Sequence, residues 1–267
     1  MRTEATSPDE TRHRLLEGVL LRLARRPDAG ELVLRGGVLL RHWFRPTPRP
    51  AEDLDLVATF PFSVEEAARR VLPILADGVV ADGVSFDPER VRLEAIYLDT
   101  GTPGVRAFVT GAWGGDEADF NVDLTFGPPP RPAPVLGDIP TASGAAARVW
   151  VCRPEAVAAQ KIQALRHLGM LSWRPKDLND LRLLLARLPL DGADLRAAVA
   201  AYMADVGGTG ADARAVFGPS SWWGMKRSSA RWLDFVKASP GRDVPRDLGG
   251  VIAEVAGRLA RVPEGLP

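Results

Sequence analysis

The sequence predicts an α+β fold, in which a mixed sheet with flanking helices is followed by an all-α C-terminal region. Two observations support this fold class. Short apolar runs and alternating patterns, typical of strands, are confined to residues 32–126. Apolar residues at helical spacing dominate from residue 154 onward. A stretch rich in Pro, Gly and Ala at 127–143 separates the two patterns and is expected to be a loop or linker. We therefore expect one domain at 1–130 and a helical domain at 145–267.

The individual elements follow from local signals. Ser7-Pro8-Asp9-Glu10 is a capping box with proline in the first turn, and helical apolar spacing follows it, which predicts a helix at 8–26. The remaining elements of the first domain are expected as a strand at 32–34, a helix after Gly36-Gly37, a strand at 54–58, a helix at 64–76, and strands at 91–98, 105–113 and 119–126. Helices of the second domain are expected at 154–167, 175–188, 192–204, 220–237 and 245–260.

Composition excludes several classes of protein. The 267 residues contain 34 basic and 34 acidic side chains, and a net charge of zero argues against a protein that coats nucleic acid by bulk charge. One cysteine and three histidines disfavour a disulfide framework and a Cys- or His-based zinc site. No run approaches the roughly 18 apolar residues of a membrane span, and residues 1–10 are polar without a signal-peptide core. We expect a cytoplasmic protein with no membrane partner.

The sharpest pattern is Gly36-Gly37 followed, after a loop, by Asp53 and Asp55. A Gly-Gly turn between a strand and a helix exposes backbone N–H groups to phosphate oxygens and lets the phosphates approach closely. Asp53 and Asp55 are two apart on a strand, so their carboxylates share one face, about 7 Å apart. Such carboxylates suit Mg²⁺. Asp123, between apolar residues of a later strand, is the candidate for a third carboxylate that completes a two-metal site.

Each of these signals alone is common on solvated surfaces, but their order, with a short apolar strand before each, favours a functional interpretation. Asp119 is a weaker candidate for the third carboxylate, because it lies at the start of its strand and is more typical of a surface residue.

A second group of charges lies in the helical region. Lys161 is expected in mid-helix beside an apolar stripe, from which its ammonium can reach out and neutralise phosphate charge. Asp177 and Asp180 are three apart and should be neighbours on one helix face. Taken alone, they are better explained as solvated acids at a helix start, where they suit the helix dipole.

Together these residues resemble the AbiEii/AbiGii-type nucleotidyltransferase toxins of the minimal nucleotidyltransferase superfamily, over most of residues 30–190. The resemblance rests on Leu-Arg-Gly-Gly-Val-Leu-Leu at 34–40, Arg-Pro-Ala-Glu-Asp-Leu-Asp-Leu at 49–56, and the spaced Lys161, Arg174, Lys176, Asp177 and Asp180. It implies a nucleotidyltransferase fold core and transfer of a nucleotide from an NTP, with Mg²⁺, to an acceptor. Ala51 stands where such proteins commonly have Ser or Thr before the first metal-binding Asp.

The resemblance also implies roles in the sheet domain. Asp53 and Asp55 would hold Mg²⁺ at the triphosphate, and Asp123 would bind a second metal or deprotonate the acceptor hydroxyl. The amides of Gly36 and Gly37 would bind the terminal phosphates.

In the helical domain, Lys161 and Lys176 would compensate phosphate charge, and Arg49 could contact phosphate. Asp177 or Asp180 would orient a lysine or contact the base or the acceptor. The helical domain is thus expected to complete the nucleotide and acceptor site.

The expected acceptor is RNA, at a tRNA 3′ end, because some members of the resembled family act there. Members are often toxins paired with a separate antitoxin, so a protein antitoxin is also an expected partner. A local charge of +5 over 146–190 supports RNA weakly. The aromatic and basic segment 222–232 could stack on bases, but its tryptophans are more simply explained as helical core. Two alternatives remain open, which are a small-molecule nucleotidyltransferase of the antibiotic-modifying type and a non-catalytic nucleotide-binding relic.

Overall fold

The computed structural model describes residues 7–45, 49–78, 80–99, 102–218 and 221–262, and they form two compact units. The first unit comprises the described parts of Met1–Arg45, Pro50–Pro129 and Pro134–Cys152. The second comprises those of Pro46–Arg49, Pro130–Ala133 and Arg153–Pro267.

The first unit is built on one mixed sheet with strand order β3-β5-β6-β2-β1-β8-β7, and β4 pairs with β5 beside this path. The strands are β1 (Leu32–Arg35), β2 (Asp53–Ala58), β3 (Val84–Phe86), β4 (Arg92–Ile96), β5 (Gly104–Trp113), β6 (Asp116–Phe126), β7 (Val135–Pro140) and β8 (Ala146–Val151). The β2–β6 and β1–β8 pairs are parallel, and the other pairs are antiparallel. The predicted mixed sheet is confirmed.

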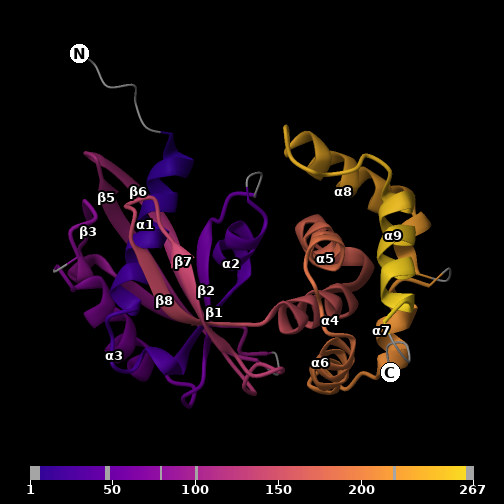
Figure 1. Cartoon of the computed structure of the whole chain (residues 1–267), viewed down its shortest axis with the longest axis horizontal. Helices are drawn as coiled ribbons and strands as arrows, with labels where there is room; N and C mark the ends of the chain where they lie inside the picture. The colour runs from indigo at the N-terminus through magenta and orange to yellow at the C-terminus, as the bar shows by residue number, and fades with distance from the viewer. Residues whose placement is uncertain (1–6, 46–48, 79, 100–101, 219–220, 263–267) are drawn as a thin grey trace. The chain divides into compact units, whose positions relative to one another are not determined.

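Three helices flank this sheet, namely α1 (Pro8–Leu23), α2 (Gly36–Trp43) and α3 (Val64–Leu75), with short 3₁₀ turns at Ala29–Glu31 and Pro88–Arg90. The Ser7 side chain caps α1 by accepting a hydrogen bond from the Glu10 N–H. Helix α1 packs against β5, β6 and β8, whereas α2 packs against β1 and β2 (Figure 1).

The sheet has one apolar face and one polar face where β2 and β6 meet. Leu54 and Leu124 are fully buried, at 0% exposure, while Asp55 and Asp123 alternate with the leucines on the opposite face. The burial of the leucines fixes which face the acids occupy, because a one-residue slip would move every side chain to the other face.

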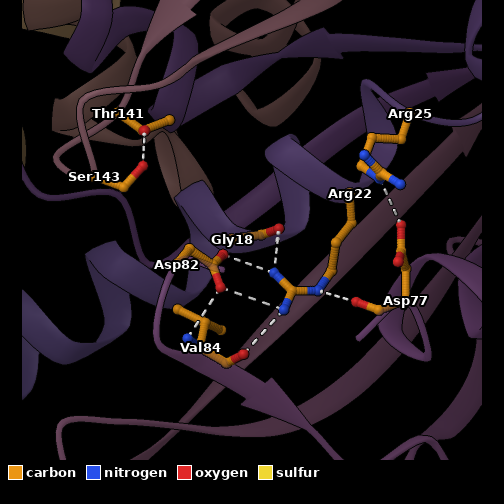
Figure 2. A network of polar contacts seen from close by, with 8 residues as sticks. All are labelled: Gly18, Arg22, Arg25, Asp77, Asp82, Val84, Thr141 and Ser143. Atoms are coloured by element: carbon orange, nitrogen blue, oxygen red, sulfur yellow. Dashed lines mark hydrogen bonds and ion pairs between the residues drawn. The ribbon is translucent and has the colours of Figure 1, made fainter. Parts of the chain in front are cut away.

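A buried arginine ties β3 to α1. The Arg22 guanidinium donates to the backbone oxygens of Gly18, Asp77 and Val84, at 2.9–3.0 Å. It also pairs with the Asp82 carboxylate, at 2.7 Å. Figure 2 shows these partners converging on the guanidinium. Because each polar atom of the buried group has a partner, its burial is tolerated.

The second unit is helical throughout its regular structure. Its helices are α4 (Pro154–Ser172), α5 (Pro175–Arg187), α6 (Gly192–Ala204), α7 (Gly210–Val216), α8 (Lys226–Lys237) and α9 (Leu248–Ala260), with a 3₁₀ turn at Trp222–Gly224. Helix α4 packs against α5, α6 and α7, and α5 packs against α8 and α9 (Figure 1). Among the helices of the described residues, none is long and apolar enough to span a membrane.

Several expectations need correction. The segment 127–143 is not only a loop, since it contains β7, an edge strand whose Pro, Gly and exposed positions hide its pairing in the sequence. Strands β3 and β8 and helix α7 were not predicted. The helix expected at 220–237 starts at Lys226, and its position 220 lies outside the described residues. Of the tryptophans at 222–232, Trp223 and Trp232 are buried, as the core interpretation predicts, whereas Trp222 is half-buried.

Candidate active site

Three aspartates converge on the polar face of the sheet. Parallel pairing of β2 with β6 makes Asp55 and Asp123 lateral neighbours and sets Asp53 beside Asn121. One carboxylate oxygen from each aspartate lies within 4.8 Å of the other two. The structure therefore brings together the three carboxylates that the sequence pattern singled out, although they come from strands far apart in the chain.

This donor set fits a divalent magnesium ion. Octahedral coordination at roughly 2.1 Å places neighbouring ligand oxygens about 3 Å apart and opposite ones about 4 Å apart. Three carboxylate oxygens that lie within 4.8 Å of one another are close enough to bind one such ion together. Oxygen ligands alone are the set that Mg²⁺ prefers.

The Gly36-Gly37 turn lies directly against one of these acids. Gly36 has a φ of +69°, and a Cβ built on it would lie 1.8 Å from Oδ2 of Asp55. The same turn starts α2, whose N-cap residue, Arg35, makes no side-chain capping hydrogen bond. The Arg35 side chain thus does not occupy the first N–H groups of α2, which a phosphate-binding helix start needs for its ligand.

Arg106 is the residue at this site that sequence reasoning missed. It lies opposite Asp123 in the antiparallel β5–β6 pair. Its Nε and Nη2 donate to the two carboxylate oxygens of Asp123, at 2.8 Å and 2.6 Å. These hydrogen bonds raise the pKa of the Arg106 guanidinium, which also feels the charge of Asp53. The signal in the sequence that could have pointed to Arg106 was its charge between apolar residues of the strand predicted at 105–113.

Asp119 does not join the acidic cluster. It lies on the same strand as Asp123 but is exposed, and it accepts a hydrogen bond from the Thr110 hydroxyl, at 2.6 Å. The expectation that Asp119 is a surface residue is confirmed.

The second unit contains a separate cluster of charges around Lys161. The Lys161 Nζ lies 2.7 Å from Asp177 and 3.2 Å from Asp180. Arg174 pairs with Asp177, at 2.7 Å, and Arg49 pairs with both oxygens of Asp180, at 3.0 and 3.2 Å for its Nε. Three cations thus share two carboxylates.

The interpretation of these two acids as solvated charges is wrong. Asp177 and Asp180 are each 1% exposed. Burial alone would raise the pKa of Asp177, but the charges of Lys161 and Arg174 outweigh burial and lower it. Burial likewise opposes the ammonium of Lys161, and the carboxylates of Asp177 and Asp180 outweigh it and raise its pKa. Lys176 is half-buried in the first turn of α5.

Comparison with known proteins identifies the family of the chain. Residues 18–246 match the family model described as "Nucleotidyl transferase AbiEii toxin, Type IV TA system". The match spans most of the chain, so the chain belongs to the AbiEii nucleotidyltransferase toxin family. A search of curated proteins found no match.

Two solved structures from Helicobacter pylori share the fold. A provisionally assigned nucleotidyltransferase superposes with a TM-score of 0.53 at 15% identity, over 95% of this chain and 94% of that chain. The protein JHP933 gives a TM-score of 0.51 at 16% identity, over 96% of this chain and 91% of that chain. At these identities the likeness concerns the fold.

Proposed function

We propose that the protein transfers a nucleotide from an NTP to an RNA acceptor, at a tRNA 3′ end, and that it is the toxin of a toxin–antitoxin pair. The observation that carries the proposal is the convergence of Asp53, Asp55 and Asp123 on one sheet face, with the Gly36 turn against Asp55. Membership of a Type IV toxin–antitoxin family supports both the transfer reaction and a protein antitoxin as partner.

The chemistry divides among the residues of the sheet unit. Mg²⁺ held by the three aspartates would supply charge that stabilises the triphosphate during transfer. The N–H groups of Gly36 and Gly37 bind the terminal phosphates at the start of α2. The acceptor hydroxyl oxygen bonds to the α-phosphorus, the bond from that phosphorus to the bridging oxygen breaks, and pyrophosphate leaves. The hydroxyl proton passes to a carboxylate, and Asp123 is the candidate for this role as the alternative to binding metal.

The charge cluster of the helical unit serves the same reaction in this proposal. The cluster has one more cation than carboxylates, which suits a phosphate ligand. In this proposal Lys161 compensates the negative charge of the phosphates, and Lys176 makes a second contact with them. The carboxylates of Asp177 and Asp180 hold Lys161 in place, and Asp180 also holds Arg49. Asp177 and Asp180 thus act as positioning residues. Arg49 is also expected to contact phosphate, and this contact would compete with its ion pair to Asp180.

A labelling assay tests the proposal. The full-length protein is incubated with Mg²⁺, total RNA or purified tRNA, and each of the four NTPs labelled at the α-phosphate. We expect label in the tRNA fraction, lost on treatment with a 3′ exonuclease. A parallel incubation replaces the RNA with aminoglycosides. No transfer to either acceptor with any nucleotide would overturn the enzymatic function, and labelling of aminoglycosides but not of RNA would identify a small-molecule transferase.

Two variants connect the activity to the site. Asp53→Ala removes one of the three converging carboxylates and should abolish transfer, whereas Asp119→Asn alters an exposed acid outside the cluster and should not. Equal transfer by wild type and Asp53→Ala would contradict the site assignment. Nucleotide binding without turnover in the wild type would identify a binding relic.

A further inference from the structure

The acidic cluster contains its own cation. Arg106 occupies both oxygens of Asp123 with two short, parallel hydrogen bonds. A fork of this kind is the strongest arrangement that a guanidinium and a carboxylate can make. Asp123 is therefore already engaged at the face where Asp53 and Asp55 converge.

The acid that faces Arg106 from the other neighbouring strand already has a cation of its own. On its other side, Arg106 lies opposite Glu94 of β4, but Glu94 forms an ion pair with Arg92. The Arg106 side chain is 28% exposed, against 9% for Asp123, so the guanidinium lies at the open side of the pair. A guanidinium that is only partly buried can move while its partner stays in the sheet.

The Arg106–Asp123 pair affects how the cluster binds a divalent ion. Three carboxylates this close repel one another, and Arg106 offsets that repulsion when no other cation is present. A divalent ion that binds Asp123 must compete with the guanidinium for the same oxygens. A triphosphate offers the displaced guanidinium new oxygens that it can also bind as a fork.

We propose that Arg106 is a positioning residue that occupies Asp123 as a counter-ion and passes to the nucleotide phosphates when metal and nucleotide bind. This inference rests on the proposed function. It makes metal and nucleotide binding mutually reinforcing, because each favours release of Asp123 by Arg106. Metal alone binds weakly, and metal with nucleotide binds well.

The test measures Mn²⁺ binding directly, by electron paramagnetic resonance of the free ion. Full-length wild type and Arg106→Gln are titrated without nucleotide and again with an unreactive α,β-methylene NTP analogue. Arg92→Gln is the matched control, because it removes an arginine from the adjacent strand that pairs with Glu94 and not with the cluster.

Without nucleotide, Arg106→Gln should bind Mn²⁺ about tenfold more tightly than wild type, and Arg92→Gln should bind like wild type. The analogue should tighten Mn²⁺ binding by about tenfold or more in wild type and by clearly less in Arg106→Gln. Unchanged Mn²⁺ affinity in Arg106→Gln, with binding intact in wild type, would overturn the inference and leave the proposed function standing.

A second variant keeps the test decisive if Arg106→Gln does not fold, as judged by circular dichroism. Arg106→Lys keeps the charge but loses the fork, so it should bind Mn²⁺ more tightly than wild type and show weaker coupling to the analogue. Wild-type affinity and coupling in Arg106→Lys would contradict the inference. If neither wild type nor any variant binds Mn²⁺, the proposed function fails as well, which separates the two outcomes.

Discussion

The carboxylate of Asp55 fills the space that a side chain on Gly36 would occupy. A Cβ at this position would lie 1.8 Å from Oδ2 and 2.5 Å from Cγ of Asp55. The backbone of Gly36 also has a φ of +69°, which L side chains rarely adopt. The turn that starts α2 and the strand that carries the acids are thus fitted to each other, and glycine is required for two independent reasons.

Replacing Gly36 should disable the site more than it destabilises the fold. Gly36→Ala must displace Asp55 or the turn, and a shift of about 1 Å in a reacting group can lower a rate about a hundredfold. We expect at least that loss in the labelling assay, with about 1–2 kcal/mol lost from the free energy of unfolding through the left-handed backbone alone.

Gly114→Ala separates the two reasons. Gly114 has a similar φ of +64°, but nothing lies within 4 Å of a Cβ built there. It should lose comparable stability and keep its transfer rate. A similar loss of activity in both variants would show that the contact with Asp55 is not the cause.

Neighbouring acids on β6 should differ sharply in their effect on activity. Asp123→Asn removes a charge from the converging cluster and should lower the transfer rate about a hundredfold or more. Asp119→Asn alters an exposed side chain. Among the described residues, its carboxylate accepts a hydrogen bond from Thr110 and lies outside the cluster, so the transfer rate should stay at the wild-type level. Rates measured under saturating NTP decide between these outcomes, and a strong loss in Asp119→Asn would move the site toward the start of the strand.

Two arginines near the α1 C-terminus should differ in their contribution to stability (Figure 2). Arg22→Ala removes a guanidinium at 2% exposure and leaves the buried Asp82 carboxylate without its cation, which should cost about 3–5 kcal/mol of unfolding free energy. Arg25→Ala breaks a half-exposed pair with Asp77 and should cost about 0–1 kcal/mol. Urea unfolding monitored by circular dichroism measures both, and equal costs would refute the structural role of Arg22.

The Lys161–Asp177 pair should make stability depend on pH in a defined direction. The pKa of Asp177 is lowered in the folded protein, so its contribution is present above the unfolded pKa of about 3.9 and is lost as pH falls through the folded pKa. The pKa of Lys161 is raised, so its contribution is present below about 10.4 and is lost as pH rises through the folded pKa.

Asp177→Asn isolates this effect. The variant should be less stable than wild type at pH 7, and the difference in unfolding free energy should shrink as pH falls below about 5. Urea titrations at a series of pH values provide the measurement. A difference that stays constant down to pH 3 would mean that the charge of Asp177 does not contribute.

Much of the fold, and the Asp53–Asp55 part of the acidic cluster, can be predicted from patterns within short stretches of the sequence. Strong alternation predicted β2 and most of β6, and capping signals predicted α1. The pair at Asp53 and Asp55 was evident because both residues lie on one strand, where period-2 geometry alone puts them on one face.

The rest depended on pairings that no local pattern encodes. Arg106 could be placed beside Asp123 only once the register of β5 against β6 was known. The burial of Asp177 and Asp180 depends on how α5 packs against α4, α8 and α9 and on Arg49, which lies far away in the sequence. Strand β7 owes its regularity to pairing with β8, since its own sequence contains Gly137 and Pro140.

The position of β6 between β5 and β2 also has a consequence for the order of folding. Hairpin β5–β6 can form early because its strands are joined by a tight turn, but parallel pairing with β2 must close a long loop first. Asp123 meets Asp55 only when β6 pairs with β2. A chain emerging from the ribosome therefore has no assembled acidic cluster until β6 has been synthesised and inserted beside β2.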